Sequence, residues 1–535
     1  MKPTTISVAA TILVTALAAA AIGSFGFYAH ALLLKYPPVW PDEALFANPA
    51  LNLIRRGALS MDVYSGALPG IAQHTYFMPP LYYFYLAGFF YIGGPGVVVM
   101  RLSSLVAAMA VMMLTYSVAL RSGLGRRLSL IPVCLLAVNT AFLRAALIGR
   151  MELLTLAFIL AALWLALGPT GSEDCLGAKR SFFAGLACAL AGLTHPFGAV
   201  AAIAVMGVRA VIPGGPRRKV LPSMLAGTLL PVAAWAAYIL QDWRSFVAQF
   251  GAQAMAKLSH HASRPSGPVS SAAAAHGLGY VLHVVLADVA QFGPELRKPD
   301  EVMFLLAVTG GLAGLCLAAL NRRALLVLLA CQPMIVVLAV LGREMWYPAY
   351  LVPLTAVGLG HLIHVAKQRI PWRVACATAA VLLCAWFGLR SLRVTSKINY
   401  ERNVVYKDGT NYTAWCAGIS RALPSNSRVL ISSVPDPYFC LAGRQDLALR
   451  EFLHESVPID PQQYRQYMAD ADYVVTGPDQ KNLMTENQSP SPTVDAFVRS
   501  SGKLLTVVGA SPSQGYFARI YTVTKRFQAV AHETP

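Results

Sequence analysis

The chain has 535 residues, of which 56% are hydrophobic and only 13% charged, and its mean hydropathy is +0.54. This composition excludes an ordinary soluble enzyme and a disordered chain, and it predicts that most of the protein lies in a lipid bilayer. The formal net charge is +18, but the Lys and Arg residues form short clusters between apolar runs, as in the cytoplasmic loops of membrane proteins. We therefore expect no nucleic-acid partner.

The first apolar run covers residues 6–34 and follows Lys2. It is about twice as long as the hydrophobic region of a signal peptide, so it is predicted to be an uncleaved first membrane span with the N-terminus in the cytoplasm. A signal peptide is the alternative, because Ala29-His30-Ala31 resembles a cleavage site.

Further apolar runs predict more membrane helices, at residues 99–120, 128–147, 153–168, 181–195, 196–212, 220–240, 301–320, 324–341, 347–366 and 374–392. With the N-terminus inside, this set places every strongly basic loop in the cytoplasm, as the positive-inside rule requires. These loops are 121–127, 177–180, 213–219, 321–323 and 367–373. We predict about 11 spans and an external C-terminus.

Two other apolar segments fit the membrane surface better than a span. Residues 75–94 contain Pro79-Pro80 and several tyrosines, and counting them as a span would move the basic loop 121–127 outside. The same reason applies to residues 278–293. Both are predicted to be interfacial or re-entrant helices, and the number of spans rises to about 13 if both cross the membrane.

The sequence changes character after Leu392. Residues 393–535 are polar and mixed, and we read a helix near 411–423 and strands at 427–434, 471–477, 503–510 and 516–523. We therefore predict a membrane domain over residues 1–392 and a soluble α/β domain over residues 393–535, on the outer side. Cys416 and Cys440 both lie in the soluble part, and the sequence leaves open whether they form a disulfide bond.

Polar residues gather at the predicted outer turns. Ionisable groups near membrane depth are costly, so they indicate a functional site. Each also has a structural alternative. Asp42 would be the N-cap of a helix that runs to Gly57, Glu43 and Glu152 would be first-turn acids, and His195 would be a cap. Arg150 and Arg343 would extend to the membrane interface, where Trp346 and Tyr347 are common residues. The residues that share the outer face are Asp42, Glu43, Arg150, Glu152, His195, Arg343, Trp346 and Tyr347.

Four stretches follow one another in an informative order: PDEALFANPALNLIRRG, HTYFMPPLYYFYLAGFF, VVVMRLSSL and ALIGRMELLTLAF. They resemble the N-terminal module of the GT-C glycosyltransferases, which include protein O-mannosyltransferases and the aminoarabinose transferase that modifies lipid A. THPFG and WYPAYLVPL resemble later elements of bacterial members, so the resemblance covers about residues 1–366. It predicts an α-helical polytopic GT-C membrane fold of about 11–13 helices with a small C-terminal α/β extracytoplasmic domain.

The resemblance implies an integral membrane glycosyltransferase at the outer face of the bacterial inner membrane. It would move a sugar from a polyprenyl-phosphate donor to an acceptor hydroxyl by an inverting single displacement, with Asp42 as the base and Glu43 and Glu152 beside it. Cations would stabilise the leaving phosphate, and aromatic residues would line the substrate. We assign Arg150, His195, Arg343 and His74 to the phosphate, and Tyr76, Tyr82, Trp346, Tyr347 and Arg101 to the substrate lining.

Several alternatives stay open at this point. One alternative is a divalent metal held by Asp42 and Glu152, because GT-C members differ in metal use. The sugar is undetermined, and its acceptor is a lipid, a protein or a cell-wall glycan. A transporter or flippase of lipid-linked sugars is disfavoured, because the charges lie at one face and no inverted repeat is found. A polysaccharide polymerase or ligase would not require the early Asp-Glu pair.

Overall fold

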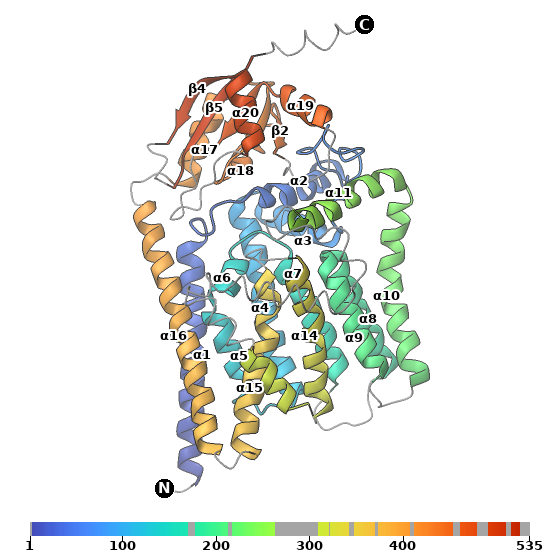
Figure 1. The fold of residues 1–535 in the computed structure, drawn as a ribbon, viewed down its shortest axis with the longest axis vertical. Coiled ribbons are helices and arrows are strands. Elements are labelled where there is room, and N and C mark those ends of the chain that lie inside the picture. The colour runs from blue at the N-terminus through green and yellow to red at the C-terminus, as the bar shows by residue number, and fades with distance from the viewer. Residues whose placement is uncertain are drawn as a thin grey trace.

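The structure is a computed structural model that describes residues 3–168, 177–211, 217–262, 309–319, 321–341, 347–369, 373–406, 411–452, 461–478, 491–509 and 515–524. Figure 1 shows a bundle of long helices with a mixed α/β domain at one end. This confirms the predicted class, a helical membrane fold with a small C-terminal α/β domain. The predicted interfacial segment 278–293 and the predicted site residues Arg343 and Trp346 lie outside the described residues.

The bundle is built from helices that match most of the predicted spans. They are α1 (Pro3–Leu32), α4 (Val97–Arg121), α5 (Leu130–Val138), α6 (Thr140–Ala146), α7 (Glu152–Leu167), α8 (Ala178–Thr194), α9 (Pro196–Val211), α10 (Arg217–Ile239), α14 (Arg322–Leu341), α15 (Val352–Arg369) and α16 (Arg373–Val405). Among the described residues, four helical segments are long and apolar enough to cross a membrane: Ile12–Leu32, Val97–Arg121, Val220–Ile239 and Thr378–Val405.

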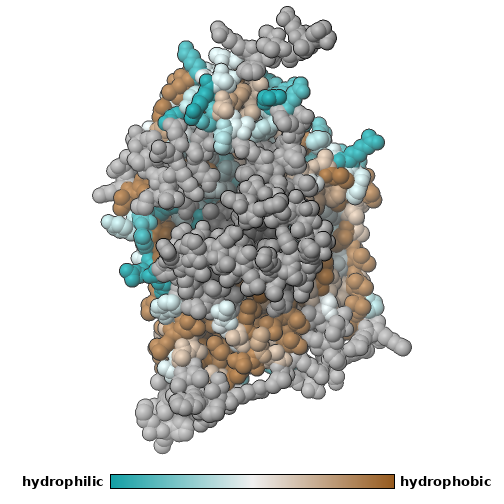
Figure 2. Space-filling model, viewed as in Figure 1, coloured by the Kyte–Doolittle hydropathy of each residue, from teal (hydrophilic) through white to brown (hydrophobic). Residues whose placement is uncertain are grey.

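The surface of the bundle supports its place in lipid. Large apolar side chains are exposed on the outer helices, such as Leu13 on α1, Leu230 on α10 and Leu382 on α16, which are 61%, 66% and 62% exposed. Side chains of this kind are stable in contact with lipid tails and costly in contact with water. In Figure 2 hydrophobic residues are exposed on the lower part of the molecule, and hydrophilic ones gather towards the C-terminal domain.

The spans predicted at 128–147 and 374–392 differ from the observed helices. The span predicted at 128–147 is broken between α5 and α6, because the Asn139 side chain accepts a hydrogen bond from the Phe142 N–H (2.9 Å) and so starts a new helix. The last span, predicted to end at residue 392, continues as α16 to Val405. Apolar periodicity does not show either feature, since both depend on polar residues at the helix ends.

Three of the basic loops meet at one end of the bundle. The guanidinium carbons of Arg121 and Arg180 lie 3.6 Å and 5.9 Å from the centroid of the Trp164 ring. The Asn321 side chain donates a hydrogen bond to the Ser122 carbonyl (3.1 Å). Arg121 ends α4, whereas the first residue of that helix belongs to the hydrophobic core of the C-terminal domain. The loops therefore share the end opposite that domain, as the charge pattern predicted.

Three further helices lie between the bundle and the C-terminal domain: α2 (Pro41–Arg56), α3 (Leu81–Gly93) and α11 (Trp243–Ala262) (Figure 1). α3 has 13 residues, fewer than a span requires, in agreement with the interfacial helix predicted at 75–94. α2 ends where the sequence predicted. Gly57 has a φ of 65°, and its N–H bonds to the Leu53 carbonyl, a conformation that favours glycine.

The C-terminal domain contains a mixed five-stranded sheet in the order β2-β1-β3-β5-β4. The first three strands are parallel and the last two pair antiparallel. All four predicted strands are present, but β2 was missed, because its sequence ALRE is short and lacks alternation. The elements are α17 (Tyr412–Ala422), β1 (Arg428–Ser432), α18 (Tyr438–Leu441), β2 (Ala448–Glu451), α19 (Pro461–Ala469), β3 (Tyr473–Thr476), α20 (Pro492–Ser501), β4 (Gly502–Val508) and β5 (Ala518–Val523).

A disulfide bond joins Cys416 on α17 to Cys440 on α18. Trp415 and Ile419 pack beside it in a hydrophobic core that also includes Val39, from the segment before α2. The core of the domain is therefore continuous with the end of the bundle next to α2.

Candidate active site

The two neighbouring acids at the start of α2 have different roles in the helix. Trp40 is the N-cap residue, so Asp42 and Glu43 occupy the second and third positions of the helix. Glu43 forms the cap, because its Oε2 accepts a hydrogen bond from the Trp40 N–H (3.0 Å). The sequence alternative that made Asp42 the N-cap is therefore wrong, and the side chain of Asp42 is available for another role.

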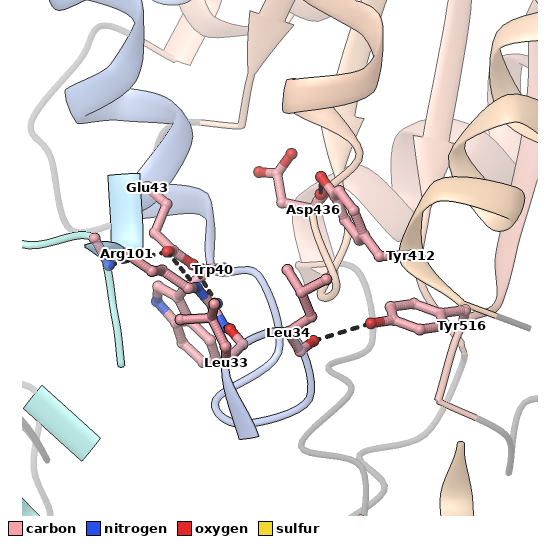
Figure 3. Close-up of polar contacts among 9 residues, drawn as sticks. Leu33, Leu34, Trp40, Glu43, Arg101, Tyr412, Asp436 and Tyr516 are labelled. Atoms are coloured by element: carbon pink, nitrogen blue, oxygen red, sulfur yellow. Dashed lines mark hydrogen bonds and ion pairs between the residues drawn. The ribbon is translucent and has the colours of Figure 1, made fainter. Parts of the chain in front are cut away.

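Glu43 forms a closed ion pair with Arg101 of α4. Both side chains are 0% exposed, and the Arg101 Nη2 and Nε atoms lie 2.7 Å and 2.9 Å from the two carboxylate oxygens (Figure 3). The Gly149 N–H also donates to Glu43 Oε1 (2.9 Å), and Arg101 Nη1 donates to the Leu33 carbonyl (2.6 Å). Both oxygens of Glu43 are thus engaged, which favours a positioning role over the predicted catalytic and substrate-lining roles of these two residues.

Asp42 belongs to a second, open cluster. The Arg150 Nη1 atom forms an ion pair with Asp42, and Nη2 lies 2.8 Å from Glu152 Oε1. The side chains of Arg150 and Glu152 are 4% and 2% exposed, whereas that of Asp42 is 35% exposed. The structure therefore brings Asp42 together with Arg150 and Glu152, which lie more than a hundred positions further along the chain. Of these three side chains, only the carboxylate of Asp42 is open to a substrate.

Aromatic rings surround this cluster. The Arg150 guanidinium carbon lies 5.7 Å from the centroid of the Phe46 ring, and Tyr82 packs edge-on against Phe46 at 5.7 Å. Tyr82 and Tyr350 both lie within electrostatic reach of Glu152. Glu152 Oε2 is buried without a hydrogen-bond partner among the described residues. A buried carboxylate oxygen of this kind is costly unless a ligand donates to it.

The alternative left open by the sequence, a divalent metal held by Asp42 and Glu152, does not fit this arrangement. Arg150 lies between the carboxylates of Asp42 and Glu152 and bonds to both of them. In the described part of the chain, no group of three or more His, Cys, Asp and Glu side chains is arranged to hold a metal ion.

His195 lies at the break between α8 and α9. Its Nδ1 accepts a hydrogen bond from the Phe197 N–H (3.1 Å), as a capping group does. Its ring lies 6.2 Å from that of Tyr347 and 6.3 Å from that of Tyr350, in the short helix η1 (Tyr347–Tyr350). The contacts at Nδ1 agree with the capping alternative. Phe46 and Tyr350 were missed by the sequence analysis, although Tyr350 stands in the singled-out stretch WYPAYLVPL.

His74 and Tyr76 belong to another aromatic cluster. The His74 Nδ1 atom lies 3.3 Å from the Tyr238 hydroxyl, and the Tyr76 ring lies 5.2 Å from that of Tyr238. The Tyr76 N–H donates to Gln249 Oε1 (2.7 Å). These contacts fix the segment after α2 to α10 and α11. Gln249 is fully buried and was missed, because an isolated Gln gives no sequence signal.

No protein-family model matches the chain, and no curated protein matches its sequence. Solved structures do resemble it. ArnT from Cupriavidus metallidurans bound to undecaprenyl phosphate has a TM-score of 0.54 and 14% identity, covering 96% of this chain and 97% of that chain. The oligosaccharyltransferase of Archaeoglobus fulgidus tethered with an acceptor peptide gives 0.52 and 11%, covering 92% and 72%.

Arabinofuranosyltransferase AftD from Mycobacteria gives a TM-score of 0.53 and 16% identity, covering 96% of this chain and 40% of that chain. At such low identities the likeness concerns the fold. It extends over nearly the whole chain, including the C-terminal domain. The chain therefore has the GT-C fold, the membrane architecture that its N-terminal motifs predicted.

Proposed function

We propose that the protein is an integral membrane glycosyltransferase that moves a sugar from a polyprenyl-phosphate donor to an acceptor hydroxyl. The observation that carries this proposal is the open cluster, in which the accessible carboxylate of Asp42 shares the buried guanidinium of Arg150 with Glu152. The donor class is supported by the likeness to ArnT, whose structure holds undecaprenyl phosphate.

Asp42 is the proposed general base. It accepts the proton of the acceptor hydroxyl while the hydroxyl oxygen attacks the anomeric carbon. The bond from that carbon to the phosphate oxygen breaks, and polyprenyl phosphate leaves with the bonding electrons. One displacement on one face of the sugar inverts the anomeric configuration.

Arg150 connects the base to the donor in this mechanism. Its guanidinium bonds to Asp42 and Glu152 in the structure, and a donor phosphate would compete with Asp42 for it. Donor binding would then release the Asp42 carboxylate for the acceptor, while Glu152 keeps Arg150 in place. Arg150 also stabilises the charge that grows on the leaving phosphate. We propose Arg343 as a second cation for that phosphate, from its sequence position alone.

We also propose that this site faces the outer side of the bacterial inner membrane. The disulfide bond between Cys416 and Cys440 is typical of an oxidising compartment. The C-terminal domain that contains it lies against α2, at the end of the bundle opposite the basic loops (Figure 1). Lipid-linked donors suit that side, where nucleotide sugars are absent.

A transfer assay tests the proposal. The purified protein is incubated in detergent with a labelled polyprenyl-phosphate sugar and a membrane-lipid, peptide or glycan acceptor. A transferase releases polyprenyl phosphate and labels the acceptor, whereas a flippase leaves the donor chemically unchanged. A polymerase or ligase would instead lengthen or attach a preformed glycan. Mass spectrometry of envelope lipids and glycans from cells with and without the protein identifies the sugar and the acceptor.

A further inference from the structure

Three arginines from different helices gather at the end of the bundle opposite the C-terminal domain. Arg121 is the last residue of α4, whereas Arg180 and Arg323 lie in the first turns of α8 and α14. The guanidinium carbons of Arg121 and Arg180 lie 3.6 Å and 5.9 Å from the centroid of the same ring, that of Trp164. All four residues are partly buried. The packing of the helices therefore holds these cations, which are not freely solvated side chains.

The start of α14 is fixed to the end of α4. The Asn321 side chain donates a hydrogen bond to the Ser122 carbonyl (3.1 Å), and its oxygen accepts one from the Arg323 N–H (3.0 Å). The positive charges of Arg180 and Arg323 both act on Arg121. The contacts that hold the cluster together thus come from an aromatic ring and an amide, and they supply no negative charge.

The charges of this cluster oppose one another. Like charges repel, and the N-terminal end of a helix is its positive end, where acidic residues are favoured. The first turns of α8 and α14 contain basic residues and no acidic ones. In the part of the chain that the structure describes, no carboxylate forms an ion pair with Arg121 or Arg180. A bound anion would balance these charges.

The surroundings indicate which anion fits. Guanidinium groups bind phosphate oxygens in a bidentate manner, and a tryptophan beside them is typical of the membrane interface. Phe183 follows Arg180 by about one turn of α8, and its side chain is 44% exposed on the surface of the bundle. An acyl chain can cover such a ring, whereas free phosphate cannot.

We propose that Arg121, Arg180 and Arg323 bind the phosphate of an anionic membrane lipid, with its acyl chains beside Phe183. The bound phosphate joins the ends of α4, α8 and α14 and removes the repulsion among their cations. The lipid is thus a structural ligand of the bundle. This proposal does not rest on sugar transfer, and it concerns the end of the molecule away from the candidate active site.

Lipid titration of the full chain tests the site. The purified protein in a neutral detergent is titrated with phosphatidylglycerol, and binding is followed by thermal unfolding and by native mass spectrometry. Phosphatidylglycerol should raise the unfolding temperature of the wild type and remain bound in the mass spectrum. Arg180→Gln should weaken binding by about tenfold or more, because a charged hydrogen bond to the phosphate is lost.

The matched control is Lys179→Gln. Lys179 is the exposed neighbour of Arg180, so this variant loses the same charge from the same turn of α8. Its binding should stay within about twofold of the wild type, because an exposed charge contributes little to a specific contact. Without lipid, Arg180→Gln should be no less stable than the wild type, since the substitution removes repulsion. If Arg180→Gln does not fold, Arg323→Gln removes a cation of the same cluster from α14.

Four results would overturn the proposal. Equal weakening in Lys179→Gln and Arg180→Gln would mean that lipid responds only to the total charge of this face. An equal loss of stability in Arg180→Gln with and without lipid would mean a purely structural arginine. Inorganic phosphate that gives the full thermal shift would remove the lipid assignment. Tighter lipid binding after Glu173→Gln and Asp174→Asn together would mean that acids of the chain, and not a lipid, balance the cluster.

Discussion

The two ion-pair clusters at the start of α2 begin at neighbouring residues and differ in almost every physical respect. Glu43 and Arg101 are fully buried, and both carboxylate oxygens of Glu43 are hydrogen-bonded within the protein. Asp42 is 35% exposed, and it shares Arg150 with a glutamate that keeps one oxygen without a partner among the described residues. The closed cluster stabilises the fold, and the open cluster is suited to bind and react.

This difference shows how one short segment serves both needs. Removing one partner of a buried ion pair strongly destabilises the folded protein. Glu43 bonds to Arg101 of α4 and to the Gly149 N–H, so it fixes α2 relative to α4 and to the turn at Gly149. That rigidity places the adjacent Asp42 within reach of Arg150. A base that was itself the helix cap could not move towards a substrate without loosening the helix, and here a separate residue forms the cap.

The largest effect is expected for Asp42→Asn. Asn keeps the shape of Asp and can still accept a hydrogen bond from Arg150, but it cannot take a proton, so transfer should fall by about 10²–10⁴-fold. Thermal stability should change little, because Glu43 caps the helix. Asp62→Asn is the matched control, since Asp62 forms an exposed ion pair with Arg56 (2.9 Å) and should retain full activity. A rate within about threefold of the wild type for Asp42→Asn would remove the distinction between the clusters.

Glu43→Gln should affect stability instead. It leaves the buried guanidinium of Arg101 without its charge partner, which should cost about 3–5 kcal/mol of folding free energy. The amide oxygen of Gln can still accept the hydrogen bond that caps α2, so the rate per folded molecule should fall much less than in Asp42→Asn. The measurement is thermal unfolding in detergent, with Glu401→Gln as a control, because Glu401 forms a looser, partly exposed pair with Lys397. Unchanged stability in Glu43→Gln would contradict the structural role.

Glu152→Gln should give an intermediate loss of activity. Gln preserves the volume of the side chain but not the charge that anchors Arg150, so the guanidinium should be less well placed for the donor phosphate. Misplacement of a positioning group costs about 10²-fold in rate. Steady-state kinetics should show a lower kcat with the protein still folded. A kcat equal to that of the wild type would place Glu152 outside the mechanism.

The smallest effect is expected from metal removal. Arg150 occupies the space between the two carboxylates, so treatment with a chelator should change the transfer rate by less than about twofold. Activity that is lost on chelation and restored by Mg²⁺ or Mn²⁺ would mean that a metal displaces Arg150 in the working enzyme.

Much of the fold could be predicted from the sequence, because apolar length and basic loops depend on local composition. The break at Asn139 and the strand β2 could not, since a side-chain cap and a short polar strand leave no periodic signal. Of the site, the common face of Asp42, Arg150 and Glu152 followed from counting spans and from the GT-C resemblance. The roles of Glu43 and Arg101 did not follow, because their pairing joins helices that lie far apart in the chain. Burial decides whether a carboxylate is engaged within the protein or accessible to a substrate, and the sequence does not show the burial of a single residue.

Chemical rescue is the most direct test of Asp42 as the base. Azide is already an anionic nucleophile and needs no base, and the exposure of Asp42 indicates that a small anion can reach this position. In Asp42→Ala, azide should attack the anomeric carbon, displace the lipid phosphate and restore consumption of the donor. The expected product is a glycosyl azide with the anomeric configuration inverted, and Asp62→Ala should need no rescue. Acceptor-dependent transfer by folded Asp42→Ala at the wild-type rate, without azide, would contradict the assignment.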